Sequence, residues 1–109
     1  MGDCIFCKIK NKEIPSEVIL EKDDFMVIKD INPKAPIHYL LFPKKHIESM
    51  LDTCEDDSKV IAEMMLETKE LAKKLGLGKR GYKIVINTGV EGGQEIMHLH
   101  FHFLGGEQM

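Results

Sequence analysis

The chain has 109 residues, of which 43% are hydrophobic and 30% charged, a composition typical of one ordinary globular domain spanning 1–109. Its formal net charge is −3, and its basic residues are spread along the chain, which argues against a nucleic-acid partner but not against a single nucleotide as ligand. No apolar run is long enough to cross a bilayer and no N-terminal signal is recognisable, so we expect no membrane partner and a cytoplasmic location.

The first half of the sequence predicts a short helix followed by three strands. The segment 4–15 reads as a short helix or turn that ends before Pro15. The strands are expected at residues 17–21, 25–30 and 38–43. Asp23 and Asp24 supply a turn signal that makes the first two strands a β-hairpin, and the proline-punctuated segment 31–36 is a loop. One helical turn is expected in the connection after Pro43.

A change of period marks a long helix in the second half. From about Glu55, residues recur three and four positions apart and form one face of an amphipathic helix: Ile61, Met64, Met65, Thr68, Leu71, Ala72 and Leu75. Thr53 with Asp56 resembles a capping pair at its start, and Gly76 suits the left-handed position past its end. Two more strands are expected at residues 82–88 and 98–104.

Together these segments predict an α+β fold. It has about five mostly antiparallel strands, one long helix that covers a face of the sheet, and a short N-terminal helix. A chain of this length buries only about two-thirds of the surface that it exposes when unfolded. A dimer interface or a structural metal would therefore help to stabilise it.

The segment HLHFHFL at 98–104 is the most informative part of the sequence. On a strand, His98, His100 and His102 share one face at a spacing of about 6.5–7 Å, while the residues between them share the other face. We expect the apolar set to pack under the long helix and the three imidazoles to line an open face. Three histidines on one face are hard to explain by folding alone, because neighbouring cations repel each other below their pKa.

Two kinds of chemistry use histidines in this pattern. Alternating imidazoles can be ligands of a catalytic zinc ion. Alternatively, one imidazole is a nucleophile toward phosphorus, and its neighbours hold its tautomer and donate to phosphate oxygens. Gly89, Gly92 and Gly93, just before the histidines, can turn successive backbone N–H groups toward an anion. This loop is often only a turn, but its position beside the histidines favours a phosphate.

Three ordered blocks of the sequence resemble the histidine triad family, and within it the nucleotide-binding, purine nucleoside phosphoramidase branch. The blocks are DINPKAPIHYLLFPKKHI at 30–47, LGLGKRGYKIVINTGVEGGQ at 75–94 and HLHFHFLGG at 98–106. The resemblance covers nearly the whole chain. It implies a histidine triad fold, a homodimer, a purine nucleotide ligand of the AMP or GMP type, and hydrolysis of purine nucleoside 5′-phosphoramidates or related nucleotidyl adducts.

The resemblance also implies the roles of individual residues. His100 matches the nucleophile, which attacks the α-phosphorus and forms a nucleotidyl-histidine that water hydrolyses; no cofactor is required for this chemistry. His102 matches the histidine that contacts the phosphate and the leaving group, and His38 matches one that supports the nucleophile. The implied nucleotide contacts are Asp30 and Ile31 at the ribose, Asn87 and the backbone of Gly93 and Gln94 at the phosphate, and Ile5, Phe6, Ile9 and Ile28 at the purine.

Several of these positions also have structural explanations. Asp30 precedes Asn32 and Pro33 and suits the start of a turn, and the four apolar residues of the purine pocket suit an ordinary core. Glu95 departs from the family pattern, because some relatives carry a serine there that donates to the phosphoryl or leaving group. An ionised carboxylate repels phosphate, so Glu95 either points away, is protonated, or favours a cationic or amine leaving group.

Cys4 and Cys7 form a C-x-x-C motif. With three cysteines and no secretory context, zinc or redox chemistry is favoured over a disulfide framework, and a thioredoxin-like motif has no room for its preceding strand. Some family members with this spacing bind structural zinc, and the resemblance then implies four ligands: Cys4, Cys7, His46 and His98. The alternative is a pair of buried cysteines without metal. Cys54 has no evident partner.

The sequence also fits other functions. A dinucleoside polyphosphate hydrolase is the nearest enzymatic alternative. A nucleotide-binding regulatory module with little catalysis belongs to a different class and uses the same pocket. A catalytic zinc enzyme that uses all three histidines is the third alternative, and chelation should abolish its activity.

Overall fold

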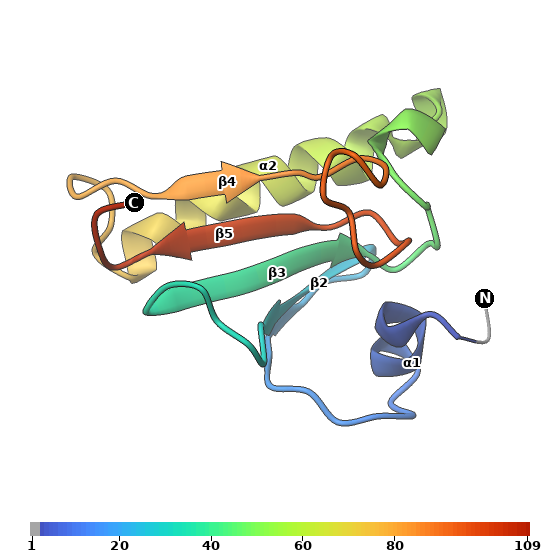
Figure 1. The fold of residues 1–109 in the computed structure, drawn as a ribbon, viewed down its shortest axis with the longest axis horizontal. Coiled ribbons are helices and arrows are strands. Elements are labelled where there is room, and N and C mark those ends of the chain that lie inside the picture. Colours follow the sequence, from blue (N-terminus) through green and yellow to red (C-terminus); the bar gives the residue numbers. More distant parts are fainter. Residues whose placement is uncertain (1–2) are drawn as a thin grey trace.

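A computed structural model describes residues 3–109 and contains one antiparallel five-stranded sheet with two helices (Figure 1). The strands lie in the order β1-β2-β3-β5-β4. Their bounds are β1 Val18–Glu21, β2 Phe25–Lys29, β3 Ile37–Pro43, β4 Lys83–Val85 and β5 Phe101–Gly105. The helices are α1 Ile5–Lys10 and α2 Ser58–Lys74, with 3-10 turns at Met50–Asp52 and Glu55–Asp57. The predicted α+β fold is confirmed.

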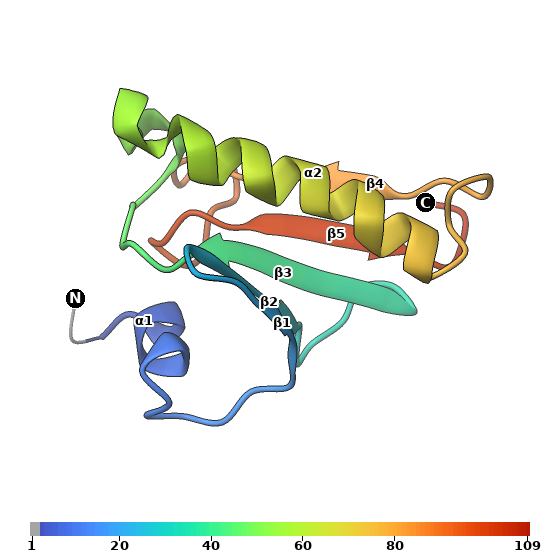
Figure 2. The same cartoon turned by 180° about the vertical axis from the view of Figure 1, so that it is seen from behind.

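The two helices lie on opposite faces of the sheet. α2 runs behind β5 and β4 in Figure 1 and in front of them in Figure 2, while α1 lies against the other face, beside the hairpin of β1 and β2. Because the central strands are covered on both faces, β2 and β3 are almost continuously buried rather than alternating between buried and exposed. Within residues 3–109, no helix is long and apolar enough to cross a membrane.

Side chains on alternate positions of the strands build two separate cores. Phe101 and Phe103 of β5 point to the α2 side and pack with Leu41 of β3 and Met64 of α2. On the α1 side, Phe6 joins Met26, Ile28, Leu40 and Phe42, and the rings of Phe6 and Phe42 stack with centroids 4.5 Å apart. The expected packing of the apolar residues of HLHFHFL under the long helix is confirmed.

The face that carries the histidines is covered at His98 and His100 and open only as a cavity, which corrects the expectation from the sequence. His98 has no exposed surface and His100 is 7% exposed, because α1 packs onto this face. Phe6 lies edge-on to both imidazoles, with ring centroids 5.4 Å from His98 and 5.1 Å from His100. The alternation of HLHFHFL did not reveal this cover, since α1 is remote in sequence.

The last two strands are shorter than expected. The predicted strands at 82–88 and 98–104 shrink to β4 and β5, and the predicted helical turn after Pro43 is reduced to the 3-10 turn at Met50–Asp52. The chain before β5 bonds locally instead of to a strand: the amide of His98 donates to the carbonyl of Ile96, and that of Leu99 donates to the carbonyl of Ile47. These bonds hold His98 and His100 outside the regular ladder.

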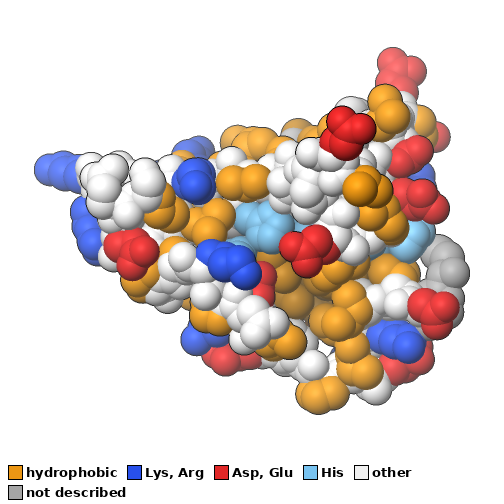
Figure 3. Space-filling model, in the orientation of Figure 1, with side chains coloured by type: hydrophobic (Ala, Val, Ile, Leu, Met, Phe, Trp, Pro, Cys, Tyr) orange, Lys and Arg blue, Asp and Glu red, His pale blue; other side chains and the backbone are white. Residues whose placement is uncertain are grey.

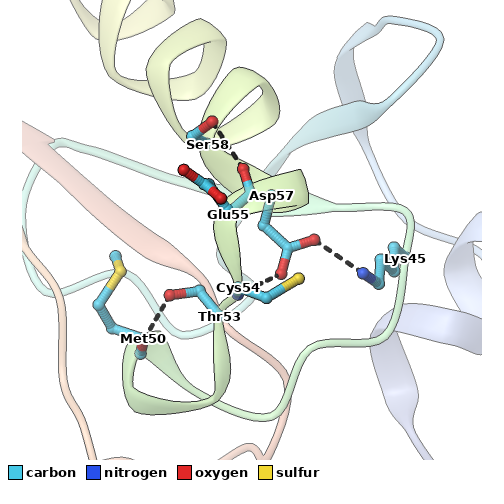
Figure 4. A network of polar contacts seen from close by, with 7 residues as sticks. All are labelled: Lys45, Met50, Thr53, Cys54, Glu55, Asp57 and Ser58. Atoms are coloured by element: carbon cyan, nitrogen blue, oxygen red, sulfur yellow. Dashed lines mark hydrogen bonds and ion pairs between the residues drawn. The ribbon is translucent and has the colours of Figure 1, made fainter.

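The start of α2 also differs in detail (Figure 4). The amide of Cys54 donates to Asp57 Oδ2 at 2.9 Å, whereas the Thr53 hydroxyl donates back to the carbonyl of Met50 at 2.8 Å. The expected pair of Thr53 and Asp56 is therefore wrong, because a 3-10 turn precedes the helix and moves the acidic capping residue to Asp57. The Lys45 ammonium donates to Asp57 Oδ1 and ties this turn to the end of β3.

The buried face of α2 is narrower than its periodicity suggested. Met64, Thr68, Leu71 and Ala72 are buried, but Met65 is 41% exposed, which corrects its assignment to this face. Gly76 has φ +72°, as expected for the residue past a helix end.

Neighbouring positions of α2 allow a direct test of this packing. Met64→Ala should lower the free energy of unfolding by about 2–5 kcal/mol, because Met64 is fully buried in the α2-side core. Leu66→Ala should change it by less than about 0.5 kcal/mol, since Leu66 is 60% exposed. Urea unfolding of both variants measures the difference, and equal losses would contradict the packing described.

Candidate functional site

A cavity of about 540 Å³ opens on the α1 side of the sheet, between α1, the end of β2, β5, β4 and the glycine-rich loop. Figure 3 shows histidine side chains at the bottom of this hollow, hydrophobic side chains beside them and charged side chains around the rim. It brings together every predicted catalytic and nucleotide-contacting residue except Gln94: Ile5, Phe6, Ile9, Ile28, Asp30, Ile31, His38, Asn87, Gly93, Glu95, His100 and His102.

His100 is held in one tautomer by a backbone carbonyl. Its Nδ1 lies 2.7 Å from the carbonyl oxygen of His98, and because that oxygen can only accept, Nδ1 carries the proton and donates. The lone pair is then on Nε2, the ring nitrogen that remains for the cavity. Burial lowers the pKa of His100 below its ordinary value, so the imidazole is neutral near pH 7.

His38 and His102 are joined in a chain of hydrogen bonds. This chain leaves the proton of His102 on Nε2, the nitrogen that carries no proton in His100. The amide of Lys34 donates to His38 Nδ1 at 3.0 Å, so the proton of the neutral His38 ring is on Nε2. That N–H donates to His102 Nδ1 at 2.9 Å, and the proton of His102 is consequently on Nε2. The cavity thus receives a lone pair from His100 and an N–H donor from His102.

Burial keeps this chain neutral. It is the main cause of the lowered pKa of His38, which Asp30 opposes and Lys34 reinforces. Burial, followed by the charges of His100 and His38, lowers the pKa of His102 to about 4. Both rings are therefore uncharged near pH 7, in agreement with the tautomers that their partners require.

Two predicted roles need adjustment in this geometry. His38 bonds to His102 and not, among the described contacts, to the nucleophile candidate His100, so its influence on His100 is indirect. Asp30 fits both interpretations of its position, the start of a turn and a contact in the binding site. Its Oδ1 accepts from the amide of Asn32 at 2.8 Å, as in a turn, while Oδ2 lies 3.4 Å from His38 Nε2 at the edge of the cavity.

The glycine-rich loop is closed by side chains from within the loop. Asn87 Nδ2 donates to the carbonyl of Gly92 at 2.8 Å, and Gly93 adopts φ +85° next to Asn87. A Cβ on Gly92 would lie 2.2 Å from the carbonyl oxygen of Thr88, so only glycine fits there. Gln94 is buried and bridges the amide of Gly89 and the carbonyl of Glu48, which places its side chain in the loop rather than in the cavity.

The residues at the apolar end of the cavity have both roles that the sequence left open, part of the core and part of a binding pocket. Phe6, Ile9 and Ile28 are buried members of the α1-side core and also line the cavity. Ile5 and Ile31 are exposed and lie at its mouth, with Ile31 83% exposed. The predicted apolar pocket is therefore one wall of a core rather than a separate surface.

A second cluster lies at the N-terminal end of α1. The ligand atoms of Cys4, Cys7, His46 and His98 lie within 4.8 Å of one another and can hold a metal ion. The distances from Sγ to Nδ1 are 3.1 Å for Cys4 and His98, 3.8 Å for Cys7 and His98, and 3.5 Å for Cys7 and His46. Two atoms bound to one tetrahedral zinc at about 2.0–2.3 Å are separated by similar distances.

The tautomer of His98 also fits a metal. Its Nε2 donates to the carbonyl of Pro43 at 2.8 Å, which leaves the lone pair of Nδ1 directed at the two sulfurs. The tautomer of His38 argues against a metal ion at a second group of possible ligands, Asp30, His38 and His102. His38 Nε2 carries a proton and therefore has no lone pair for a metal. The three triad histidines do not converge on one metal, since His98 belongs to the cysteine cluster.

Some residues of the cavity were missed by the sequence interpretation. Lys83 and Val85 of β4 and Leu104 of β5 line its far side, and the amide of Lys34 fixes His38. The register between β4 and β5, in which Val85 pairs with His102, places these side chains on the histidine face. Alternation along both strands is the signal that could have found them, had the strand pairing been known.

Comparisons with known proteins agree with this geometry. The HIT domain family model matches residues 11–109. Protein HitA of Neisseria gonorrhoeae is 47% identical over 105 residues, which are 96% of this chain and 97% of HitA. A HIT family hydrolase from Legionella pneumophila has a TM-score of 0.95 at 45% identity and covers 98% of this chain and 96% of its own.

A more distant solved structure shares the fold as well. A histidine triad nucleotide-binding protein from Candida albicans has a TM-score of 0.84 at 33% identity, over 93% of this chain and 73% of that chain. The match of sequence and fold over almost the full length leaves one assignment. The chain belongs to the HIT domain family, whose solved relatives include hydrolases.

Proposed function

We propose that this protein hydrolyses purine nucleoside 5′-phosphoramidates or related nucleotidyl adducts through a nucleotidyl-histidine at His100. The observation that carries the proposal is the opposite protonation of two neighbouring imidazoles in one cavity: His100 offers a lone pair on Nε2, and His102 offers a proton on Nε2. A nucleophile beside a hydrogen-bond donor is what displacement at phosphorus requires.

In the first step, His100 Nε2 bonds to the α-phosphorus and the bond from phosphorus to the leaving nitrogen breaks. The ring becomes a cation, and its Nδ1–H stays bonded to the carbonyl of His98. One proton taken from solvent reaches the leaving nitrogen through His102, and the amine departs neutral. Water then attacks phosphorus, the bond to Nε2 breaks, and one proton returns to solvent, which restores the enzyme.

The rest of the cavity suits a nucleotide. The free lone pairs of the Asp30 carboxylate can accept from ribose hydroxyls, and the apolar wall formed by Phe6, Ile9 and Ile28 can take a purine face. Gly93 and Asn87 line the same cavity as the histidines, and the loop amides near Gly93 can donate to a phosphate. The apolar wall contacts the faces of a base and does not select adenine over guanine.

We also propose that Cys4, Cys7, His46 and His98 hold a structural zinc ion. The distances and the tautomer of His98 support this assignment. Zinc would tie α1 to the segment that carries the triad, and it would supply stability rather than take part in the reaction. Without metal, two cysteines and two imidazoles would share a buried site with only weak S–H donors to join them.

A homodimer and a cytoplasmic location are also part of the proposal. β4 is a short edge strand of the sheet, and edge strands offer unpaired backbone groups to a second chain. Tyr82, next to β4, is an exposed hydrophobic residue. No disulfide joins Cys4, Cys7 and Cys54 within residues 3–109, as expected in a reducing compartment.

Two alternatives use the same cavity. A regulatory nucleotide-binding module would bind nucleoside monophosphates without forming a covalent intermediate. A dinucleoside polyphosphate hydrolase would form the same intermediate but react faster with polyphosphates than with phosphoramidates. Rates on both substrate types, together with trapping of the intermediate, separate the three functions.

Replacement of the nucleophile tests the mechanism first. His100→Gly should lower turnover of a purine nucleoside 5′-phosphoramidate by at least about 10³-fold, since the Nδ1 lone pairs of the other two imidazoles in the cavity, His38 and His102, already accept hydrogen bonds. Affinity for the nucleoside monophosphate should change little. Mass spectrometry after rapid quenching should find one nucleotidyl group on the peptide that contains His100 in the wild type. Near-wild-type hydrolysis by the variant would exclude the mechanism.

The pH dependence follows from the burial of His100. Since burial lowers its pKa, the neutral nucleophile persists below the ordinary value of 6.5 and is lost only at more acidic pH. We expect the acid limb of kcat/KM, which reports the free enzyme, to have its midpoint below 6.5. A midpoint at or above 6.5 would show that His100 is not the titrating nucleophile.

The metal assignment is tested with a matched pair of cysteine variants. The wild type purified without chelator should contain about one zinc per chain, and Cys7→Ser should lose it. Its Tm should fall by about 10 °C, because a ligand of the folded state is removed. Cys54→Ser should keep both zinc and Tm, since Cys54 is exposed and lies outside the cluster. Equal zinc content and Tm in wild type and Cys7→Ser would refute the site.

A further inference from the structure

The cavity continues past the histidines over β4, the edge strand of the sheet. Strand register places Leu40 of β3, His102 of β5 and Val85 of β4 in one row across the α1-side face. The next row toward the end of the sheet contains His38, Leu104 and Lys83. Val85, Leu104 and Lys83 all line the cavity, although none belongs to the nucleoside end.

The path of the substrate across the sheet places the leaving group in this space. The nucleoside end of the cavity, with Ile28 and Asp30, is over β2 and β3, and the imidazole of His102 is over β5. Since the strand order is β2-β3-β5-β4, a substrate whose phosphorus is at the histidines extends next over β4. His102, the proton donor for the departing atom, borders this side, because Val85 is its partner across the strands.

Two lysines line the same cavity as Val85 and Leu104. Lys83 is on β4, in the row of His38 and Leu104, and Lys34 is in the loop before β3, where its amide donates to His38. Neither has a carboxylate partner within residues 3–109, whereas Lys29, Lys44 and Lys45 are each paired with one. Lys34 is also close enough to His38 and His102 for its charge to add to the effect of burial on both imidazoles.

Glu95 is the other side chain that was considered for leaving-group recognition. It lies toward the opposite end of the cavity, near α1. Besides the main cavity, it lines a shallow hollow with Cys4, Ile5 and His46 at the start of α1. Lys83, in contrast, borders a hollow formed by Arg80 and the C-terminal residues. Among the charged side chains that line the cavity, Glu95 is thus on the side of α1, Asp30 follows β2, and Lys83 is on β4.

We propose that Val85, Leu104, Lys34 and Lys83 form a leaving-group subsite for amines with a short apolar stem and an anionic end, a carboxylate or a phosphate. The inference rests on the proposed phosphoramidate hydrolysis and adds the chemical class of the leaving group. Val85 and Leu104 accept the stem, and the two ammonium groups accept the anion. The anionic amine departs on the β4 side of the cavity, away from the nucleoside end.

Four substrates with the same purine nucleoside 5′-phosphoryl group and similar amines test the subsite. The amines are β-alanine with a carboxylate, 2-aminoethyl phosphate with a phosphate, β-alaninamide without charge, and 1,3-diaminopropane with a cation. In the wild type, kcat/KM should be about fivefold higher for an anionic amine than for the neutral one, and lowest for the cation. The two anionic arms decide between carboxylate and phosphate. Raised salt should reduce the preference.

Variants locate the preference in the structure. Lys83→Gln and Lys34→Gln should each lower the ratio of anionic to neutral kcat/KM by about two- to threefold, and the double variant should nearly abolish it. Lys73→Gln is the matched control, because Lys73 is on α2 at the opposite face of the sheet, and it should leave the ratio unchanged. Glu95→Gln should not remove the preference for the anion.

The outcomes separate this subsite from the proposed function. A neutral or cationic amine that reacts fastest in the wild type would overturn the subsite, and in the cationic case would assign recognition to Glu95. An unchanged ratio in the double lysine variant would overturn it as well. If no phosphoramidate is hydrolysed, the proposed function fails. The Kd values of the four compounds for His100→Gly then test the subsite, which predicts tightest binding for an anionic amine and weakest binding for the cationic one.

Discussion

The hydrogen bond between the Nδ1–H of His100 and the carbonyl of His98 is the interaction on which the site depends. It is 2.7 Å long and buried, and it fixes which nitrogen of His100 carries the lone pair. The same residue, His98, directs its own ring at Cys4 and Cys7. The backbone of one residue therefore orients the nucleophile candidate while its side chain anchors the metal-ligand cluster, so the cluster and the cavity share one segment of chain.

The layered packing keeps that bond in place. Phe101 and Phe103 fix one side of the segment in the core under α2, and Phe6 of α1 covers the imidazoles on the other side. Burial from both sides explains why the histidines are neutral near pH 7 and why each ring nitrogen has a defined partner. A single layer of helix on an open sheet would leave the same imidazoles hydrated and free to exchange tautomers.

Local patterns predicted much of this structure, and long-range contacts account for the rest. The alternation of HLHFHFL and the three- and four-residue period around Met64 and Leu71 were sufficient for the fold class and for the two faces of β5. The cover of His98 by α1 and the bond from His38 to His102 join residues far apart in sequence, and no local pattern contains them. The strand ends were also missed, since the bonds around Ile96 and Ile47 replace the ladder there.

The protonation pattern of the imidazoles is the central claim, and nitrogen-15 NMR of the histidine side chains measures it directly. At pH 7, the account predicts that His100 is neutral with its proton on Nδ1, and that His102 is neutral with its proton on Nε2. Resonances assigned with His100→Gly and a His102→Gln variant identify each ring. A proton on Nε2 of His100, or a cationic ring at this pH, would contradict the account, because no lone pair would then face the cavity.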